Sequence, residues 1–181
     1  MKILLTATLA IAATFATFSQ TVQKHKPRPL PTTFMETVLI DNTGAKFILN
    51  DYRGRVVLLY TWGKWCRPCR AEIPGLVDIE EKYRDLGFNV IGINIGDAEG
   101  FEEPWPVINT FAEQTNISYR LVKVPMGSAF IKQFDKLTGA EVVPQTILLD
   151  RRGRIRAAFT GGGAKVDEAR NKLISEVIKE G

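Results

Sequence analysis

Two short, largely apolar runs with a helical stretch between them define the middle of the chain. Residues 55–62 and 88–95 are rich in Val, Leu and Ile and have the length of strands that are buried on both faces of a sheet. Residues 66–86 have the length of a helix, and Gly87 follows as a helix stop. The order strand, helix, strand predicts two parallel strands joined by a crossover helix.

Weaker patterns flank this unit. Residues 35–40 and 46–49 surround a polar turn that ends in Gly44, which predicts an N-terminal β-hairpin. Further helices are expected over residues 104–116, 128–137 and 165–178, and further strands over residues 119–124, 147–150 and 155–160. Together these elements predict an α/β fold in which a mixed central sheet is covered by helices on both faces.

The N-terminus has the three-part layout of an export signal. Lys2 provides a positive start, residues 3–18 are uncharged and mostly apolar, and the small residues Thr17 and Ser19 stand at positions that a signal peptidase inspects. The apolar segment is shorter than the ~20 residues that span a bilayer comfortably. We therefore predict a cleaved signal peptide over residues 1–19, with an uncleaved membrane anchor as the alternative, and export to the periplasm or cell envelope.

Residues 20–33 mix Pro with Lys, Arg and the only His of the chain, His25. Proline makes such a segment extended and semi-rigid, and no core-forming pattern accompanies it. We predict a linker here, followed by a single folded domain over residues 34–181.

Composition narrows the function further. The net charge is +4, but no long basic run with interleaved aromatic residues points to a nucleic-acid partner. The single His lies outside the predicted domain, which argues against His-based catalysis and against zinc and copper sites. The two Cys residues stand three apart, without the second pair that a zinc site needs. We predict no metal and no cofactor.

Cys66 and Cys69 fall where the predicted central strand turns into the helix. Unpaired backbone N–H groups and the partial positive charge of a helix N-terminus should lower the pKa of the Cys66 thiol. Cys69, one turn further, faces the same side of the helix. We predict Cys66 as the exposed, attacking sulfur and Cys69 as the deeper, resolving sulfur. The alternative, an inert structural disulfide, would close a loop of a few residues and stabilise little.

Charged residues surround the pair. Glu72 follows Cys69 by three residues on the same side of the helix. If buried, its carboxyl group would have a raised pKa and could accept the proton of Cys69 during resolution; an exposed glutamate paired with an arginine is equally consistent with the spacing. Lys64, Arg67 and Arg70 crowd the helix start, where they would either stabilise a thiolate or form a solvated basic rim. The residues leave this open.

Residues 62–74 read Trp62-Gly63-Lys64-Trp65-Cys66-Arg67-Pro68-Cys69-Arg70-Ala71-Glu72-Ile73-Pro74. This segment resembles the active site of the thioredoxin superfamily, and within it the TlpA/ResA-like branch of exported thiol–disulfide oxidoreductases. The likeness extends from about residue 34 to the end and implies a thioredoxin-like fold with an N-terminal β-hairpin and an inserted strand–helix region, the latter matched only loosely. It implies Cys66 as nucleophile, Cys69 as resolving thiol, Glu72 as the active-site glutamate and a helix bent at Pro74.

Residues 143–146 read Val143-Pro144-Gln145-Thr146 and resemble the cis-proline loop of the superfamily. The resemblance implies that Pro144 is cis and packs opposite the cysteine pair, and that Val143 offers backbone hydrogen bonds to a docked substrate chain. Without the resemblance, an ordinary trans-proline turn would be expected. Three neighbours of the cysteines are also expected to contact the substrate: Trp65, Arg67 and Pro68.

Two positions depart from the family pattern. Tyr60 stands where cytosolic thioredoxins have a buried Asp, and Gln145 stands where the branch often has Thr. Because Tyr60 cannot replace the Asp as a proton acceptor, proton handling should fall to Glu72 or to water.

The residues and the resemblance together predict an exported thiol–disulfide oxidoreductase that reduces protein disulfides through a mixed disulfide. Its partners would be protein thiol or disulfide substrates and a redox protein that donates electrons. One alternative is a peroxiredoxin-like peroxidase, which would need a Pro and a Thr or Ser upstream of a single reactive Cys; Thr61 does not have that spacing. The others are a copper-binding assembly factor, which would need wider cysteine spacing and a His, and a redox-inert binding module of the same fold.

Overall fold

The computed structural model describes residues 21–180. Its strands are β1 (Thr21–Pro29), β2 (Leu39–Ile40), β3 (Lys46–Phe47), β4 (Val56–Trp62), β5 (Phe88–Asn94), β6 (Arg120–Lys123), β7 (Gln145–Leu149) and β8 (Arg154–Thr160). Its helices are α1 (Thr32–Met35), α2 (Arg67–Tyr83), α3 (Trp105–Gln114), α4 (Ala129–Thr138) and α5 (Ala164–Lys179), with the short 3₁₀ turns η1 (Leu49–Tyr52) and η2 (Arg84–Leu86).

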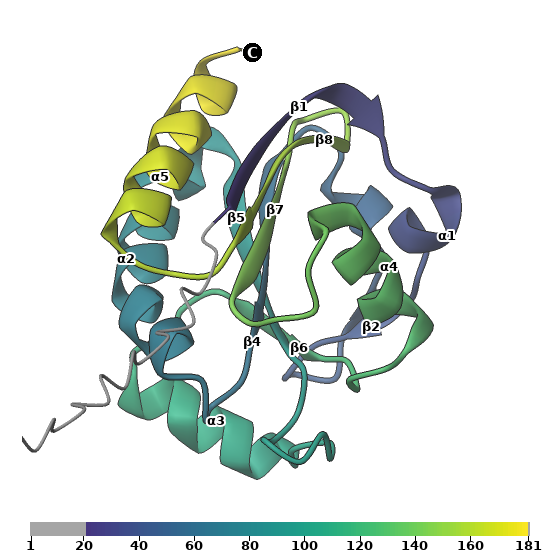
Figure 1. The fold of residues 1–181 in the computed structure, drawn as a ribbon, viewed down its shortest axis with the longest axis vertical. Coiled ribbons are helices and arrows are strands. Elements are labelled where there is room, and N and C mark those ends of the chain that lie inside the picture. The colour runs from purple at the N-terminus through teal and green to yellow at the C-terminus, as the bar shows by residue number, and fades with distance from the viewer. Residues whose placement is uncertain (1–20, 181) are drawn as a thin grey trace, which may run out of the picture.

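Six strands form one mixed sheet in the order β1-β8-β7-β4-β5-β6 (Figure 1). The strands β4, β5 and β6 run parallel to one another, whereas β7 is antiparallel to β4 and β8, and β1 is antiparallel to β8. All seven residues of β4 are buried, as expected for a central strand covered on both faces. The predicted mixed sheet is confirmed. The β2–β3 hairpin is also present, and a bridge between Asp41 and Val122 attaches it to β6.

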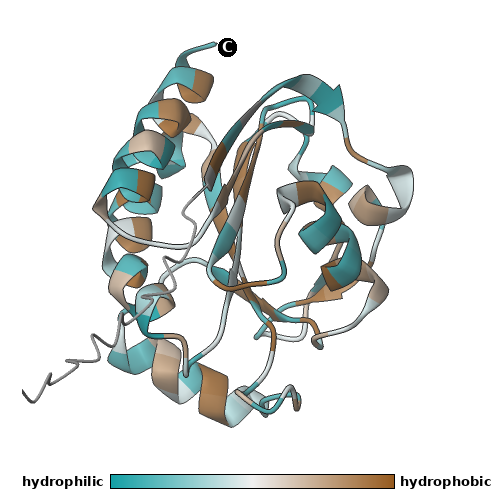
Figure 2. Cartoon of the chain, viewed as in Figure 1, coloured by the Kyte–Doolittle hydropathy of each residue, from teal (hydrophilic) through white to brown (hydrophobic). Residues whose placement is uncertain are grey.

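Helices cover both faces of the sheet and enclose two hydrophobic clusters. Alternate residues of β4 enter different clusters: Leu58 and Tyr60 pack toward α2, α3 and α5, whereas Val57 and Leu59 pack toward α1 and α4. Figure 1 shows α2 and α5 on one side of the sheet and α1 and α4 on the other. In Figure 2 the hydrophobic residues concentrate in the central strands, whereas the helices carry both kinds of residue.

The prediction of a linker over residues 20–33 is wrong where the structure describes this segment. Thr21–Pro29 is the edge strand β1, paired with β8 from Thr21 opposite Thr160 to Pro29 opposite Arg154. Backbone pairing to β8 substitutes for the missing apolar pattern, and an edge strand tolerates Pro because one side of its backbone needs no partner. The folded domain therefore begins well before residue 34. The predicted signal peptide, residues 1–19, lies outside the described residues.

The first predicted strand is also shorter than expected. Within residues 35–40, only Leu39–Ile40 forms a strand, because α1 begins directly after Pro31 and turns Phe34 and Met35 into the core. The remaining predicted helices and strands are present, with ends that differ by a few residues. Between residues 21 and 180, no helix combines the length and the apolarity needed to cross a bilayer.

Candidate active site

The two cysteines lie at the point where β4 passes into α2. Cys66 is the N-cap of α2, and its Sγ accepts a hydrogen bond from the backbone N–H of Cys69 at 3.2 Å. Pro68 occupies the first turn of the helix, where no backbone hydrogen bond is lost. The pair forms a disulfide with a Cα–Cα distance of 5.3 Å. An N–H group aimed at Sγ, at a helix N-terminus, is an arrangement that stabilises a thiolate at Cys66 after reduction.

The prediction that Cys66 is exposed is wrong for the disulfide form. Cys66 is 3% exposed and Cys69 is fully buried, and both belong to the core cluster between the sheet and α2. Neighbouring side chains form the surface around the pair instead. Trp65 is 45% exposed, and Arg67 and Pro68 are exposed as well.

Glu72 is buried one helical turn after Cys69 on α2 and belongs to a charged cluster. Arg170 of α5 places its Nη1 3.2 Å from Glu72 Oε1, and its Nη2 lies 2.7 Å from Asp167 Oδ1. The side chains of Glu72 and Arg170 are each 2% exposed. Burial raises the pKa of Glu72 to about 7; the positive charge of Arg170 opposes this rise, and the carboxylate of Asp167 adds to it. Glu72 is thus buried and also paired with an arginine, a combination that the spacing alone did not predict. We call Glu72, Asp167 and Arg170 the charged cluster.

Tyr60 does not act as a proton acceptor in place of the buried Asp of cytosolic thioredoxins. Its hydroxyl donates a hydrogen bond to the backbone carbonyl of Cys69 at 2.9 Å and so ties the first turn of α2 to the central strand. Burial, followed by the nearby negative charge of Glu72, raises the pKa of Tyr60 well above its ordinary value. Tyr60 therefore stays protonated and serves as an anchor.

The peptide bond between Val143 and Pro144 is cis, as the resemblance implied. The loop after β8 supports it: the carbonyl of Pro144 accepts the backbone N–H of Gly161 at 2.9 Å. At the next residue, Gly162, a Cβ atom would lie 3.0 Å from Glu72 Oε1 and 3.4 Å from Pro144 Cγ. The glycine therefore allows the carboxyl group and the cis-proline to approach the same backbone segment.

Gln145 ties the cis-proline loop to α4. Its Nε2 donates to Asp135 Oδ1 at 2.8 Å and to the carbonyl of Val142 at 2.6 Å, and its Oε1 accepts the hydroxyl of Thr138. Its backbone N–H donates to Thr61 Oγ1 at 3.2 Å. We call these contacts the amide network. They require a long side chain with both a donor and an acceptor, so the Gln that departs from the family pattern at position 145 has a structural role.

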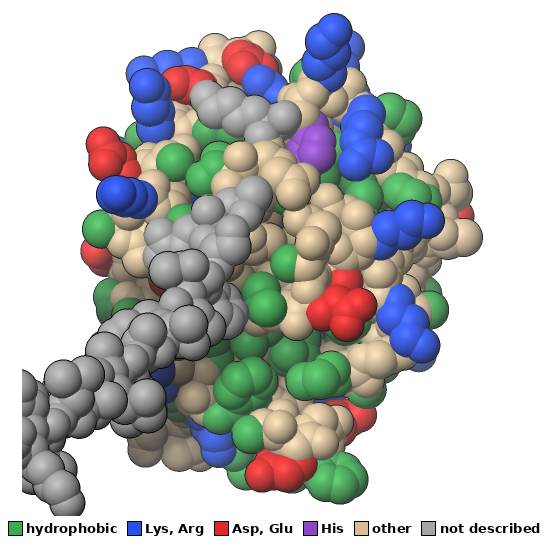
Figure 3. All heavy atoms as spheres, viewed as in Figure 1, with side chains coloured by type: hydrophobic (Ala, Val, Ile, Leu, Met, Phe, Trp, Pro, Cys, Tyr) green, Lys and Arg blue, Asp and Glu red, His purple; other side chains and the backbone are tan. Residues whose placement is uncertain are grey.

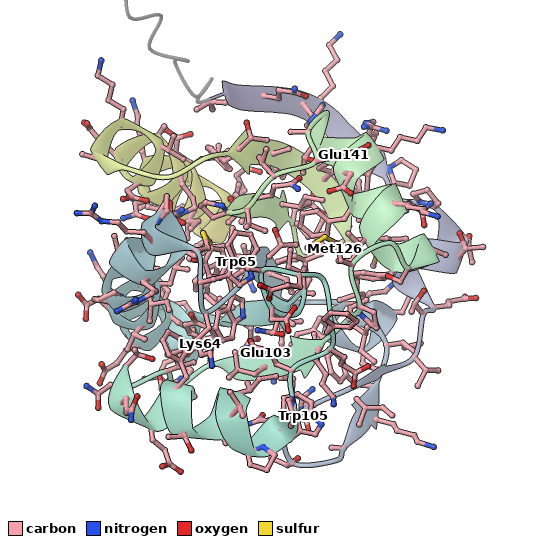
Figure 4. All side chains as sticks on the ribbon, turned by 60° about the horizontal axis from the view of Figure 1, so that its bottom comes forward. Lys64, Trp65, Glu103, Trp105, Met126 and Glu141 are labelled. Carbon is pink, nitrogen blue, oxygen red and sulfur yellow. A yellow bond between two sulfur atoms is a disulfide. The ribbon has the colours of Figure 1, made fainter. Side chains whose placement is uncertain are left out.

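A cavity of about 610 Å³ opens beside the cis-proline loop, between this loop and α4. Its lining includes Trp65, Met126, Ile131 and Val143. Trp65 is oriented by a 3.1 Å hydrogen bond from its Nε1 to the carbonyl of Gly96. Figure 4 shows Trp65 and Met126 on the same side of the molecule, and Figure 3 shows hydrophobic side chains gathered on one part of the surface. The cavity suits a largely apolar group beside Trp65, the residue that precedes Cys66.

The three cations near the helix start are not equivalent. Lys64 Nζ lies 3.2 Å from Glu103 Oε1, and Figure 4 shows the two residues together. The other oxygen of the buried Glu103 accepts a hydrogen bond from Asn94 at 2.9 Å. Arg67 and Arg70 are exposed. Because Lys64 is neutralised by Glu103, only the two exposed arginines of these three cations remain available to stabilise the Cys66 thiolate.

The structure brings the predicted residues together at one end of β4, but the sequence reasoning missed three others. Arg170 and Asp167 come from α5, and Gly162 comes from the loop between β8 and α5. One signal was available: Arg170 lies four residues after Val166 and three before Leu173, and so places a charge on the apolar stripe of α5. Such a residue requires a buried partner.

The fold and the cysteine pair define a thioredoxin-like thiol–disulfide oxidoreductase. The chain belongs to the AhpC/TSA family, which matches residues 28–158. It is 31% identical over 137 residues to the thiol-disulfide oxidoreductase ResA of Geobacillus kaustophilus, covering 74% of this chain and 71% of that protein. The crystal structure of a DsbF homologue from Corynebacterium diphtheriae is similar, with a TM-score of 0.70 and 26% identity over 90% of this chain and 96% of that chain. A thioredoxin family protein from Chlorobium tepidum shares the fold, with a TM-score of 0.67 and 21% identity over 85% and 98% of the two chains.

Proposed function

We propose that the protein is an exported reductase of protein disulfides, in which Cys66 attacks and Cys69 resolves. One observation carries this proposal: the two sulfurs have different surroundings. Cys66 is the helix N-cap and receives a backbone N–H, whereas Cys69 is fully buried on the side of α2 that also carries the buried Glu72. The first arrangement favours a thiolate and the second favours a thiol with a proton acceptor nearby.

The exchange proceeds in two steps. The Cys66 thiolate attacks one sulfur of a substrate disulfide, forms a mixed disulfide and releases the first substrate thiolate. Cys69 then loses its proton and attacks the Cys66 sulfur, which forms the Cys66–Cys69 disulfide and releases the second thiolate. Two electrons pass from the enzyme dithiol to the substrate, whose thiolates take up two protons. A dithiol redox protein must then return two electrons to the enzyme.

Glu72 is proposed as the acceptor of the Cys69 proton. It follows Cys69 by three residues, which places both on one side of α2, and both are buried. With a pKa of about 7, the carboxyl group is able to take up and release a proton near neutral pH. Arg170 binds Oε1, whereas Oε2 is buried without a hydrogen-bond partner among the described residues. Oε2 is therefore the oxygen that we assign to the proton.

The substrate is proposed to dock across the cis-proline loop. An extended chain would pair with the backbone of Val143, next to the cis peptide bond of Pro144, in the manner of an added strand. Trp65, Arg67 and Pro68 would contact the chain on its other side. The cavity bordered by Trp65 and Val143 would receive one apolar side chain of the substrate.

The cysteines can be tested separately. We expect Cys66→Ser to abolish the reduction of insulin by dithiothreitol-charged enzyme, and Cys69→Ser to accumulate a covalent adduct with a disulfide-containing protein that dithiothreitol releases. Non-reducing electrophoresis and mass spectrometry would detect the adduct. Normal insulin reduction by Cys66→Ser would contradict the proposal. Rapid consumption of hydrogen peroxide by the wild type would favour a peroxidase.

The direction of electron flow and the cellular location of the protein need separate measurements. A reduction potential near that of thioredoxin, about −270 mV, supports a reductase, whereas a value near that of DsbA, about −120 mV, would contradict one. Export rests on the predicted signal peptide over residues 1–19. Fractionation of cells and determination of the mature N-terminus would distinguish a cleaved signal from an anchor, and recovery of the protein in the cytoplasm would contradict export.

A further inference from the structure

Arg170 is a buried charge that lies between the active-site glutamate and the protein surface. The residue is 2% exposed and lies on the inner side of α5, in the helix that closes the fold. Its Nη1 contacts Glu72 Oε1 at 3.2 Å and its Nη2 contacts Asp167 Oδ1 at 2.7 Å. The side chain of Asp167 is 33% exposed. A buried guanidinium without any such partner would be strongly destabilising, so the contacts with these two carboxyl groups stabilise its position.

The geometry of this contact is rigid. Asp167 and Arg170 are one turn apart on α5, so the helix itself holds the guanidinium in place. Arginine presents a fixed, planar set of donors, which allows one guanidinium to bind both carboxyl groups at once. The segment just before α5 also approaches the site, since Gly162 lies against the Glu72 carboxyl group. One element, α5 with its preceding loop, thus defines where Glu72 can lie.

We propose that Arg170 is a positioning residue for the exchange reaction: fixed by Asp167, its guanidinium holds Oε1 of Glu72 and sets the charge of the carboxyl group that serves Cys69. The inference rests on the proposed role of Glu72 and extends it to α5.

Among the groups around Glu72, those that set its charge come from α5. Cys69 lies one turn before Glu72 on α2, and the charge of Glu72 acts on Tyr60 of β4 and on Tyr119 just before β6. Burial raises the pKa of both tyrosines above the ordinary value, so both are neutral in the working range. Among these groups, the guanidinium of Arg170 is the positive charge and Asp167 is the second negative charge.

The two α5 residues should therefore act in opposite directions. Removing the Arg170 charge leaves Glu72 beside a carboxylate without compensation, so its proton should bind more tightly. Removing the Asp167 charge leaves Glu72 the full benefit of the guanidinium, so its proton should bind less tightly. A role limited to structural support predicts a loss of stability in both variants, without opposite shifts.

The test follows the resolution step with oxidised glutathione as the substrate. Reduced protein is mixed with oxidised glutathione in a stopped-flow instrument, and tryptophan fluorescence reports the phase that does not depend on glutathione concentration. For the wild type we expect the rate of this phase to rise with pH with a midpoint near 7. Arg170→Met should move the midpoint up by about one pH unit and slow the step at pH 7 by roughly fivefold, and Asp167→Asn should move it down. Arg170→Lys keeps the positive charge and should move the midpoint back toward the wild-type value, although an ammonium group does not reproduce the planar double contact.

A control variant tests whether the effect is specific to Glu72, and a double variant is available if Arg170→Met does not fold. Arg156 of β8 forms a more exposed ion pair with Glu180 at the other end of α5, so Arg156→Met removes an arginine–glutamate pair that does not include Glu72. Its midpoint should equal that of the wild type. If Arg170→Met does not fold, the combination of Arg170→Met with Glu72→Gln replaces both buried charges and should recover the fold. Asp167→Asn, at a partly exposed position, then carries the test of direction.

The outcomes separate the inference from the proposed function. An unchanged pH profile in Glu72→Gln would remove the proposed role of Glu72 itself. If Glu72→Gln loses the midpoint near 7 while Arg170→Met and Asp167→Asn leave it in place, or shift it the same way, Glu72 keeps its role and the inference about Arg170 is overturned.

Discussion

The charged cluster and the amide network lie on opposite faces of the sheet, on either side of the cis-proline loop, and they differ in kind. The charged cluster joins α2 to α5 through a buried guanidinium and two carboxyl groups. The amide network joins the loop to α4 through Gln145, which contacts Asp135 and Thr138. Both are largely removed from water, and both position a part of the site.

The difference lies in what each can do during the reaction. In the charged cluster, the pKa of Glu72 is raised to about 7 chiefly by burial, so its charge can change as a thiol gives up a proton. In the amide network, Gln145 has no ionisable group, and its contacts with Asp135, Thr138 and Val142 hold the loop. A buried ionisable group supports proton transfer, whereas a satisfied neutral amide supports geometry.

The largest effect that separates the two clusters should be the pH dependence of stability. The pKa of Glu72 rises from its ordinary value of 4.5 to about 7 on folding. Its contribution to the free energy of unfolding is therefore complete below pH 4.5 and is lost as the pH rises through about 7. At about 1.4 kcal/mol per pH unit, this amounts to about 3 kcal/mol. Chemical denaturation of the wild type and of Glu72→Gln between pH 4.5 and 8 measures it. We expect the wild type to lose stability relative to the variant as pH rises, and a constant difference would contradict this assignment.

The amide network should respond differently. Gln145→Leu leaves Asp135 Oδ1 and the carbonyl of Val142 without the amide that donates to both, which we expect to cost about 2 kcal/mol of unfolding free energy. The midpoint of the resolution step should not move. Gln133, a partly buried glutamine on α4, provides the matched control, and Gln133→Leu should change stability by less than about 0.5 kcal/mol. A shifted midpoint in Gln145→Leu would end the distinction between the two clusters.

The smallest effect should come from the exposed arginines, which differ from Arg170 only in their surroundings. Arg67→Gln and Arg70→Gln should each raise the pKa of the Cys66 thiol by less than about half a unit, and the effect should fade at high salt. The rate of alkylation by iodoacetamide as a function of pH, in low and high salt, measures it. A large shift that persists at high salt would show that these arginines tune the thiolate directly.

Some features could be predicted from local patterns because their causes are local. The apolar run at β4, the glycine stop after η2 and the spacing of Cys66 and Cys69 placed the pair at a helix N-terminus, where the structure has it. By contrast, β1 could not be predicted, because its pairing with β8 compensates for a Pro-rich, basic sequence. Likewise, α1 replaced part of an expected strand because the core packs Phe34 and Met35 from a helical turn.

The sequence by itself determined the position, spacing and helical setting of the cysteine pair, since these depend on neighbours within one turn. It also indicated Glu72, because three residues place a side chain on the same face of a helix as Cys69. Only the tertiary structure decided how Glu72 is charged. Its partner Arg170 lies 98 residues further along the chain. Burial by the sheet, α2 and α5 raises the pKa of Glu72. Burial and long-range pairing are properties of the packed elements, which no single segment of the sequence contains.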